Sequence, residues 1–117
     1  MRFFVTYNAA EQGPPNPEKM AAIGAFADEV TKAGVLLDTG GLLPPSMGGA
    51  RVQMTGGKFS ITDGPFPETK ELIVGYAIVQ AKSRDEAIEV CRRFMAVAGD
   101  GTGEIRQMSG PNDPPHH

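Results

Sequence analysis

The sequence predicts an α+β domain in which two helices pack against one face of an antiparallel sheet. Two stretches, residues 17–34 and 83–94, carry apolar residues at three- and four-residue spacing, which is typical of amphipathic helices. Short β-like runs lie before, between and after these stretches. The resulting order is strand, helix, strand, hairpin, strand, helix, strand, and its simplest arrangement is a ferredoxin-like fold with an inserted β-hairpin.

The first strand is expected at residues 2–7, where aromatic and β-branched residues cluster. Residues 8–17 are expected to form a loop, because glycine and adjacent prolines prevent regular structure there. Asn16 resembles an N-cap, and Pro17 suits the first helical position, where its missing N–H costs nothing. The helix is expected to end at Gly34. Its apolar stripe comprises Met20, Ile23, Ala27 and Val30.

Two further strands flank the middle of the chain. Residues 35–37 are expected to form a strand that Gly40 and Gly41 bring to an end. Residues 72–79 are apolar at almost every position, which favours a central strand covered on both faces.

Between these two strands the sequence predicts a β-hairpin. Its strands are residues 51–55 and 58–62, and Gly56 and Gly57 form a two-residue loop that tolerates positive φ. The alternation along both strands is typical of a half-exposed ribbon. The expected register pairs Met54 with Phe59 and Val52 with Ile61 on one face, and Gln53 with Ser60 on the other.

The second helix begins with a capping box, in which the Ser83 hydroxyl and the Glu86 carboxylate satisfy reciprocal N–H groups. Residues 99–103 are expected to form a turn, and residues 104–108 a weak last strand. The apolar stripe of this helix comprises Ala87, Val90, Cys91 and Phe94.

The length of 117 residues indicates one domain with a single core, at residues 1–108. Residues 109–117 contain three prolines and no periodicity, so we expect a disordered tail. The histidines that end it, His116 and His117, resemble the remnant of a purification tag.

Composition excludes several classes of function. A net charge of −3 and a pI near 5.3 argue against binding of nucleic acid or anionic lipid. No signal peptide is visible, and no apolar run approaches the ~20 residues of a membrane span. A single cysteine, Cys91, excludes an internal disulfide and fits a reducing compartment, so we expect a cytoplasmic protein.

An open sheet face is the expected consequence of this fold. With both helices on one side, the other side of the sheet stays bare, and in a chain this short a second copy commonly covers it. We therefore expect a homodimer.

The break at residues 63–72 is the most informative feature for function. Glycine and two prolines exclude a helix or a central strand there, and the break is longer than a usual connection. It also holds carboxylates and a lysine, and charged loops on a rigid scaffold commonly carry function.

This break carries a family resemblance. The letters TDGPFPETKE at residues 62–71, followed by Gly75 and Tyr76, resemble the signature of DGPF-domain proteins of the YCII-related superfamily. Weaker matches extend the resemblance from Met1 to about Met108. It implies a fold of the dimeric α/β barrel type.

The resemblance also bears on activity. Some YCII-related members carry a His–Asp pair proposed as a catalytic dyad, and the position of that histidine is occupied here by Ile23. Asp63 is then the only candidate for the carboxylate half. Members of the DGPF branch are often encoded beside extracytoplasmic-function sigma factors, which implies an accessory or regulatory role.

Asp63 has two interpretations. It could act as a general base or hydrogen-bond acceptor in a dry cleft, where burial would raise its pKa. Alternatively, its carboxylate could accept hydrogen bonds from its own loop, which is a common role for Asp before Gly. Gly64, Pro65 and Phe66 are expected to shape the loop, with Phe66 filling the sheet or dimer interface.

Other polar residues could complete a site. Lys70 could hold Asp63 ionised, although exposed charge runs are usually solvated. Arg106 could clamp a carboxylate or phosphate through two hydrogen bonds, or pair with a glutamate across the sheet. Tyr7 and Tyr76 are expected to be packing residues whose hydroxyls reach the edge of the cleft.

The leading prediction is binding of a small polar molecule in a cleft lined by Asp63, Lys70 and Arg106. The alternatives are an enzyme that uses Asp63 as general base and needs no cofactor, and a regulator that binds another protein. Without His116 and His117, no Cys/His metal site or Cys–His nucleophile pair can form.

Overall fold

The computed structural model describes residues 1–10, 16–43, 46–63 and 73–110. Its elements follow the predicted order of strand, helix, strand, hairpin, strand, helix, strand. They are β1 (Arg2–Ala9), α1 (Pro17–Lys32), β2 (Leu36–Gly41), β3 (Ala50–Thr55), β4 (Lys58–Asp63), β5 (Gly75–Gln80), α2 (Arg84–Ala98) and β6 (Gly101–Met108).

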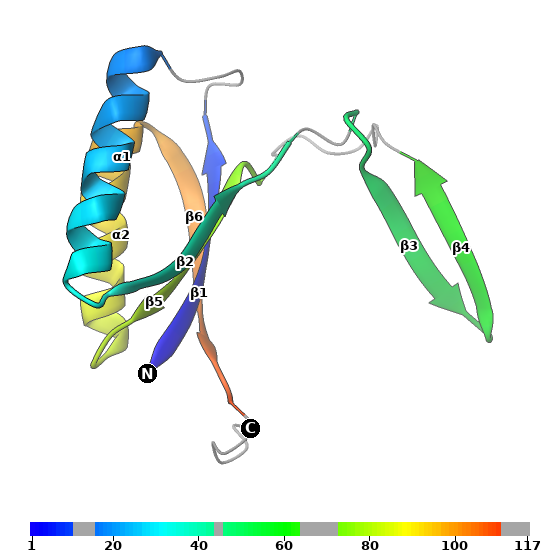
Figure 1. The fold of residues 1–117 in the computed structure, drawn as a ribbon. Coiled ribbons are helices and arrows are strands. Elements are labelled where there is room, and N and C mark those ends of the chain that lie inside the picture. The colour runs from blue at the N-terminus through cyan, green and yellow to red at the C-terminus, as the bar shows by residue number, and fades with distance from the viewer. Residues whose placement is uncertain (11–15, 44–45, 64–72, 111–117) are drawn as a thin grey trace.

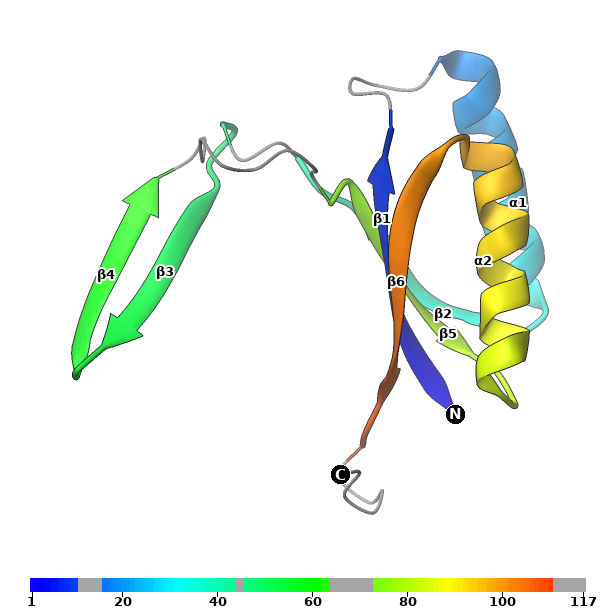
Figure 2. The same cartoon turned by 180° about the vertical axis from the view of Figure 1, so that it is seen from behind.

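Four strands form the main sheet in the order β2-β5-β1-β6, and every neighbouring pair is antiparallel. Both helices lie on one face of this sheet (Figures 1 and 2). This confirms the predicted α+β, ferredoxin-like fold, with the β3–β4 hairpin inserted between β2 and β5. No helix in the described ranges is long and apolar enough to cross a membrane.

Both helices begin at their predicted caps. The Asn16 Oδ1 atom accepts a hydrogen bond from the Lys19 N–H at 2.7 Å, and Pro17 opens α1. The Ser83 hydroxyl accepts one from the Glu86 N–H at 3.1 Å, which is one of the two bonds expected of the capping box. Each cap satisfies an N–H that has no partner inside its helix.

The core lies between the sheet and the helices. Phe3 on β1 and Val79 on β5 are cross-strand partners that are both 2% exposed, and they pack with Ala87 at the start of α2. Phe26 on α1 lies beside Phe94 on α2, with ring centroids 6.4 Å apart. This contact joins the two helices.

The predicted stripe of α1 is wrong at one end. Val30 is buried, but Met20 is 58% exposed. Figure 2 shows the first turn of α1 extending past the end of α2, so this turn lacks a neighbouring helix. Phe26, which the predicted stripe omits, makes the aromatic contact instead.

Two glycine pairs that were expected to end or precede strands lie inside them. Gly40 and Gly41 belong to β2, and Gly101 and Gly103 belong to β6. A Cβ on Gly101 or Gly103 would lie 2.4 Å from a carbonyl oxygen of β1. Glycine therefore permits close approach of neighbouring groups here, rather than interrupting the strands.

The prediction for residues 72–79 is right in part. β5 is a central strand, but it begins at Gly75, and residue 72 lies outside the described residues. Coverage on both faces is wrong for a single chain, because both helices lie on one face and no other described element packs on the second (Figure 1). The apolar residues on that second face remain partly exposed.

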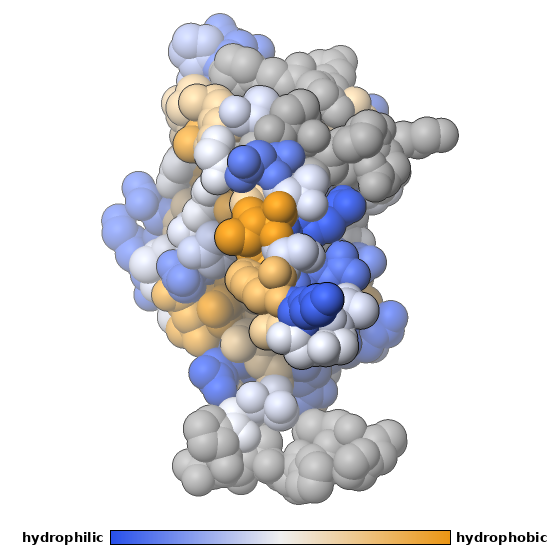
Figure 3. Space-filling model, turned by 90° about the vertical axis from the view of Figure 1, so that its right-hand side faces the viewer, coloured by the Kyte–Doolittle hydropathy of each residue, from blue (hydrophilic) through white to orange (hydrophobic). Residues whose placement is uncertain are grey.

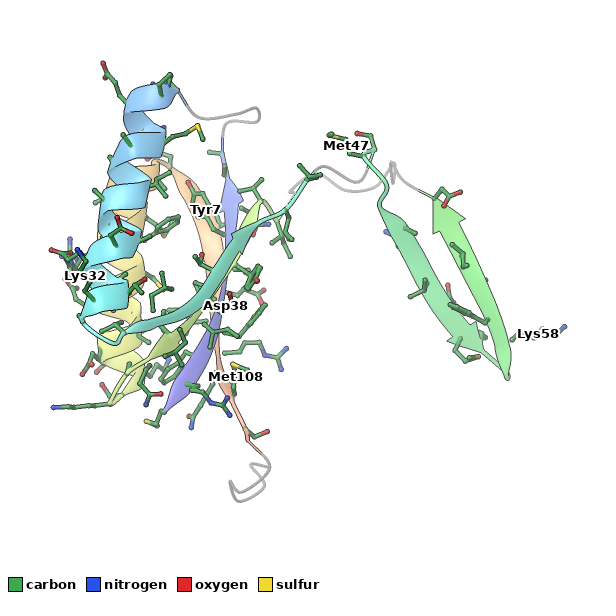
Figure 4. The ribbon with its side chains drawn as sticks, viewed as in Figure 1. Tyr7, Lys32, Asp38, Met47, Lys58 and Met108 are labelled. Atoms are coloured by element: carbon green, nitrogen blue, oxygen red, sulfur yellow. The ribbon has the colours of Figure 1, made fainter. Side chains whose placement is uncertain are left out.

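The hairpin has the predicted register. Met54 pairs with Phe59 and Val52 pairs with Ile61, and both turn glycines have positive φ, as a tight two-residue loop requires. The expectation of a half-exposed ribbon is wrong, because every residue of both strands is exposed. The hairpin stands away from the main sheet, with Lys58 at its far tip (Figures 1 and 4).

Candidate functional site

The sheet surface that faces away from the helices carries the polar groups of interest. Side chains alternate along a strand, and Phe3 points into the core. Its neighbours on β1, and the residues registered with them on β5 and β6, therefore form the opposite surface. We call this surface the open face. It includes Arg2, Phe4 and Thr6 of β1, Tyr76, Ile78 and Gln80 of β5, Glu104, Arg106 and Met108 of β6, and Asp38 and Gly40 of β2.

Asp38 and Tyr76 form a hydrogen-bonded pair on this face. The Tyr76 hydroxyl donates to Asp38 Oδ2 at 3.2 Å, and the Thr39 N–H donates to Asp38 Oδ1 at 2.9 Å. The Thr39 hydroxyl donates in turn to the Tyr76 carbonyl oxygen at 2.9 Å. Both oxygens of the carboxylate are thus oriented by neighbours on two adjacent strands.

The charge of Asp38 affects the tyrosine. It raises the pKa of Tyr76 above its ordinary value, first through its negative charge and then by accepting the hydrogen bond. Tyr76 therefore keeps its proton at neutral pH and acts as a donor. The carboxylate retains further lone pairs that could accept hydrogen bonds from a ligand.

An aromatic surface adjoins this pair. The Phe4 and Tyr76 rings are stacked with centroids 6.0 Å apart and planes inclined by 13°. Gly40 lies beneath the Tyr76 ring, where a Cβ would come within 2.7 Å of Cε1. The small residue at position 40 lets the ring lie close to β2 and so places the hydroxyl beside Asp38.

Tyr7 lies on the other side of the sheet. Its side chain is labelled in Figure 4. Its hydroxyl donates to the carbonyl oxygens of Gly99 at 2.9 Å and Asp100 at 3.1 Å, and its ring makes a T-shaped contact with the Phe94 ring. Burial raises the pKa of Tyr7, and the charge of Asp100 adds to the effect. Tyr7 joins β1 to the end of α2 and does not face the Asp38–Tyr76 pair.

The remaining predicted site residues lie in separate places. Arg106 is on the open face, paired with Phe4 across β1 and β6. Asp63 is the last residue of β4, is exposed, and pairs with Ala50. The described residues thus do not bring Tyr7, Arg106 and Asp63 together. The predicted residues Gly64, Pro65, Phe66 and Lys70 lie outside the described residues.

Asp38 is not among the site residues that the sequence predicts. It lies immediately before Thr39 and the two glycines that were taken as the end of a strand. A carboxylate next to strand glycines was the available signal, because glycine inside a strand commonly marks the close approach of another group.

Metal-binding chemistry finds no support in the described part of the chain. In residues 1–10, 16–43, 46–63 and 73–110, no three His, Cys, Asp or Glu side chains gather closely enough to hold an ion. Cys91 lies half-buried on α2, and burial raises the pKa of its thiol.

Figure 3 views the molecule from the side of the hairpin. Hydrophobic atoms lie exposed in the middle of that side, and hydrophilic atoms border them. The hairpin residues Val52, Met54, Phe59 and Ile61, which we call the apolar hairpin face, are each between 55% and 67% exposed. Apolar side chains exposed in such a group commonly mark an interaction surface.

Among solved structures, the chain is similar to 5-chloro-2-hydroxyhydroquinone dehydrochlorinase (TftG) from Burkholderia phenoliruptrix AC1100, which was determined in complex with 2,5-dihydroxybenzoquinone. The TM-score is 0.54 at 15% sequence identity, over 93% of this chain and 94% of the other. This likeness concerns the fold.

A curated relative is an uncharacterised protein of Rhizobium meliloti (strain 1021), which is 32% identical over 68 residues. The match spans 57% of this chain and 55% of that protein, so just over half the length of the relative is covered. The model of the YCII-related domain family matches residues 1–109, nearly the whole sequence, and the chain therefore belongs to this family.

Proposed function

We propose that this YCII-related protein binds a small polar molecule on the open face of its sheet. The observation that carries the proposal is the hydrogen bond from Tyr76 to Asp38 beside the Phe4 ring. It gives one oriented carboxylate, one tyrosine hydroxyl whose oxygen can still accept a hydrogen bond, and one apolar surface within a single group. Small-molecule sites commonly combine apolar area with a few oriented polar groups in this way.

The chemistry of the ligand follows from these groups. Asp38 offers acceptor oxygens, so the ligand carries a hydroxyl or amine that donates. The stacked Phe4 and Tyr76 rings favour a flat, partly apolar body. A small hydroxylated ring has both properties, and the structural neighbour was determined with such a molecule.

The break at residues 63–72, which we call the DGPF segment, supplies a second group of residues to the proposed site. Val74, which leads from that segment into β5, donates a hydrogen bond to the Tyr7 carbonyl at 2.8 Å and accepts one from Leu42 at 2.9 Å. Val74 therefore connects the start of β5 to β1 and to Leu42, which follows β2, the strand that carries Asp38. Asp63 and Lys70 would contribute charged groups to the ligand site.

The test is ligand-dependent thermal stabilisation across a library of small hydroxylated and carboxylated compounds. A ligand at a hundred times its Kd stabilises the folded state by about 2.7 kcal/mol. We expect a compound that stabilises the wild type and that loses this effect with Asp38→Asn and with Tyr76→Phe. Asp85→Asn, an exposed change on α2, is the control and should retain the effect.

The same series decides the role of the DGPF segment. Loss of stabilisation with Asp63→Asn would support its contribution, whereas retention would limit the site to the open face. If no compound in the library stabilises the wild type, or if Asp38→Asn binds as tightly, the proposal fails.

An enzymatic role is the second candidate. A protonated tyrosine hydrogen-bonded to a carboxylate is a pair that can move a proton, and the structural neighbour is named a dehydrochlorinase. In this version Asp38 accepts the proton and no cofactor is needed, whereas Asp63, the base that the sequence suggests, ends β4 of the hairpin that stands away from the main sheet. Turnover that disappears with Asp38→Asn would favour catalysis by the pair over binding alone, and turnover that disappears only with Asp63→Asn would favour Asp63 as the base.

Three expectations from the sequence remain part of the proposal. They are a homodimer, a cytoplasmic location, and an association with an extracytoplasmic-function sigma factor, which rests on the DGPF resemblance alone. Binding of the purified sigma factor through the apolar hairpin face would support the last of these.

A further inference from the structure

The open face carries two arginines near one edge of the sheet. Arg2 lies opposite Met108 and Arg106 lies opposite Phe4, so the two arginines are diagonal neighbours on β1 and β6. Diagonal neighbours are about 7–8 Å apart at their backbones, a distance that long side chains span. Both arginines are exposed. Their guanidinium groups can therefore reach the same small anion.

The protein does not neutralise these two charges in the part that the structure describes. Among the described residues, no carboxylate forms an ion pair with either arginine, whereas two arginines of α2 each pair with a glutamate. Glu104 is on the same face of β6 as Arg106, but it lies opposite Thr6, on the side away from Arg2. Two neighbouring positive charges repel each other, and an anion bound between them removes this repulsion.

A row of residues leads from the arginines to the hydrogen-bonded carboxylate of Asp38. The strand register places Phe4 between Arg106 and Ile78. Ile78 in turn lies opposite Asp38, which is labelled in Figure 4 and belongs to the edge strand β2. The row is thus basic at one end, apolar in the middle and acidic at the other end.

The length of this row indicates the size of the ligand that fits it. Neighbouring strands are about 4.8 Å apart, so the strands at its two ends are roughly 14 Å apart. A hydrogen bond of about 2.8 Å at each end leaves roughly 8 Å for the ligand itself. One aromatic ring with polar groups at opposite ends spans an interval of this order, whereas a lone carboxylate reaches only one end.

The composition of the row indicates the chemistry of that ligand. Phe4 is 37% exposed, and its ring is stacked with that of Tyr76, so the middle of the row offers an aromatic surface. Aromatic rings bind such a surface by offset stacking. At the basic end, a guanidinium group presents two parallel N–H donors that match the two oxygens of a carboxylate.

We infer that the ligand of the open face is an aromatic hydroxy acid, and that its carboxylate binds Arg2 and Arg106 together. The ring then lies on Phe4, and the hydroxyl at the other end of the ligand donates to Asp38. This inference rests on the proposed function, to which it adds the charge of the ligand and the residues that recognise this charge. The sequence suggests Arg106 as a clamp for a carboxylate, and the strand register adds Arg2 to it.

Four related compounds separate the contributions of the two ends of the row. They are para-hydroxybenzoate, its neutral methyl ester, benzoate, which lacks the hydroxyl, and hydroquinone, which lacks the carboxylate. Isothermal titration calorimetry on the full chain at neutral pH measures each Kd. We expect para-hydroxybenzoate to bind about tenfold more tightly than the ester or hydroquinone, because hydrogen bonds between charged groups contribute by this order. Benzoate should also bind more weakly, because it cannot donate to Asp38.

Substitution of the arginines tests which residues recognise the carboxylate. Arg2→Gln and Arg106→Gln remove the charge but keep a long polar side chain. Each should raise the Kd of para-hydroxybenzoate about tenfold and leave that of the ester unchanged. Arg84→Gln, at the exposed start of α2, is the matched control and should change neither Kd.

A conservative variant separates binding from a loss of folding. Arg106→Lys keeps the charge without the two parallel donors, so it should bind para-hydroxybenzoate more tightly than Arg106→Gln but less tightly than the wild type. Circular dichroism and thermal unfolding check that every variant is folded before its Kd is compared.

Salt gives a readout that a purely structural role of the arginines would not change. Screening weakens exposed ion pairs, so the Kd of para-hydroxybenzoate should rise with salt concentration, whereas that of the ester should not. In Arg106→Gln the rise should be smaller than in the wild type.

The outcomes distinguish this inference from the proposed function. If the acid and its ester bind equally tightly, or if the arginine variants affect both compounds alike, the inference fails. Binding of the ester that requires Asp38 would still uphold the proposed function in that case. If Asp38→Asn binds every compound as tightly as the wild type does, the proposed function fails and the inference fails with it.

Discussion

The Tyr76 hydroxyl donates a hydrogen bond to Asp38 Oδ2 at 3.2 Å, across the boundary between β5 and β2. The two residues are 38 positions apart in the sequence, and the register brings them to adjacent strands. The negative charge of Asp38, which the fold places beside Tyr76, therefore raises the pKa of the tyrosine hydroxyl. The pH at which Tyr76 ionises is a measure of whether the two side chains are in contact.

We predict that Asp38→Asn lowers the pKa of Tyr76 toward its ordinary value, because the negative charge of Asp38 is the main cause of the increase. Ultraviolet absorbance of ionised tyrosine, followed as the pH is raised, measures this change. Asp100→Asn is the control, because Asp100 affects the pKa of Tyr7 rather than that of Tyr76. An unchanged titration of Tyr76 in Asp38→Asn would show that the pair does not form in solution.

The same pair has a consequence for stability at high pH. The pKa of Tyr76 is higher in the folded than in the unfolded state. Its contribution is therefore fully present below the unfolded pKa, about 10, and is lost as the pH rises through the folded-state pKa. We expect the unfolding free energy, measured with urea, to fall over this range, and to fall less steeply in Tyr76→Phe.

Much of the architecture could be predicted from local signals. The helix caps at Asn16 and Ser83 and the register around Gly56 and Gly57 depend on neighbours in the sequence, and the structure confirms them. The Asp38–Tyr76 pair depends on strand register instead. Gly40 was expected to stop a strand, because nothing near it in the sequence requires a glycine inside one. The residue that requires it is Tyr76, which is distant in the sequence and whose ring lies against Gly40 in the fold.

We predict that Gly40→Ala destabilises the fold. The new Cβ would lie 2.7 Å from Tyr76 Cε1, so the ring must move and loses packing against Phe4, and a cross-strand pair of this kind contributes about 0.2–1 kcal/mol. Chemical denaturation measures the loss. In a Tyr76→Leu background the ring is absent, so the same substitution should cost clearly less.

Gly24→Ala is the matched control for this substitution. Gly24 lies inside α1, and a Cβ there meets nothing within 4 Å. Alanine favours a helix interior over glycine, so the change should stabilise the fold by about 0.5–1 kcal/mol. If both glycine variants shift the unfolding free energy in the same direction, the close approach at Gly40 is not the cause.

The role of Tyr7 gives a prediction of a different kind. Tyr7→Phe keeps the ring against Phe94 but removes the hydroxyl that bonds to the Gly99 and Asp100 carbonyls. Loss of such a bond costs about 1 kcal/mol. We expect this decrease in the unfolding free energy together with unchanged ligand binding, because Tyr7 faces the helices. A Tyr7→Phe variant of normal stability that no longer binds ligand would instead assign the hydroxyl to the site.

Cys91 allows the packing of α2 to be tested without substitution. It is half-buried on the helix, and burial raises the pKa of its thiol, so less of the reactive thiolate is present at a given pH. We predict that iodoacetamide alkylates Cys91 more slowly in the folded chain than in the chain unfolded by urea, as followed by mass spectrometry. The unfolded chain serves as the internal control, since it exposes the same thiol without the helix. Equal rates in the two states would mean that α2 does not shield this side chain, and would contradict the packing of its apolar stripe on the sheet.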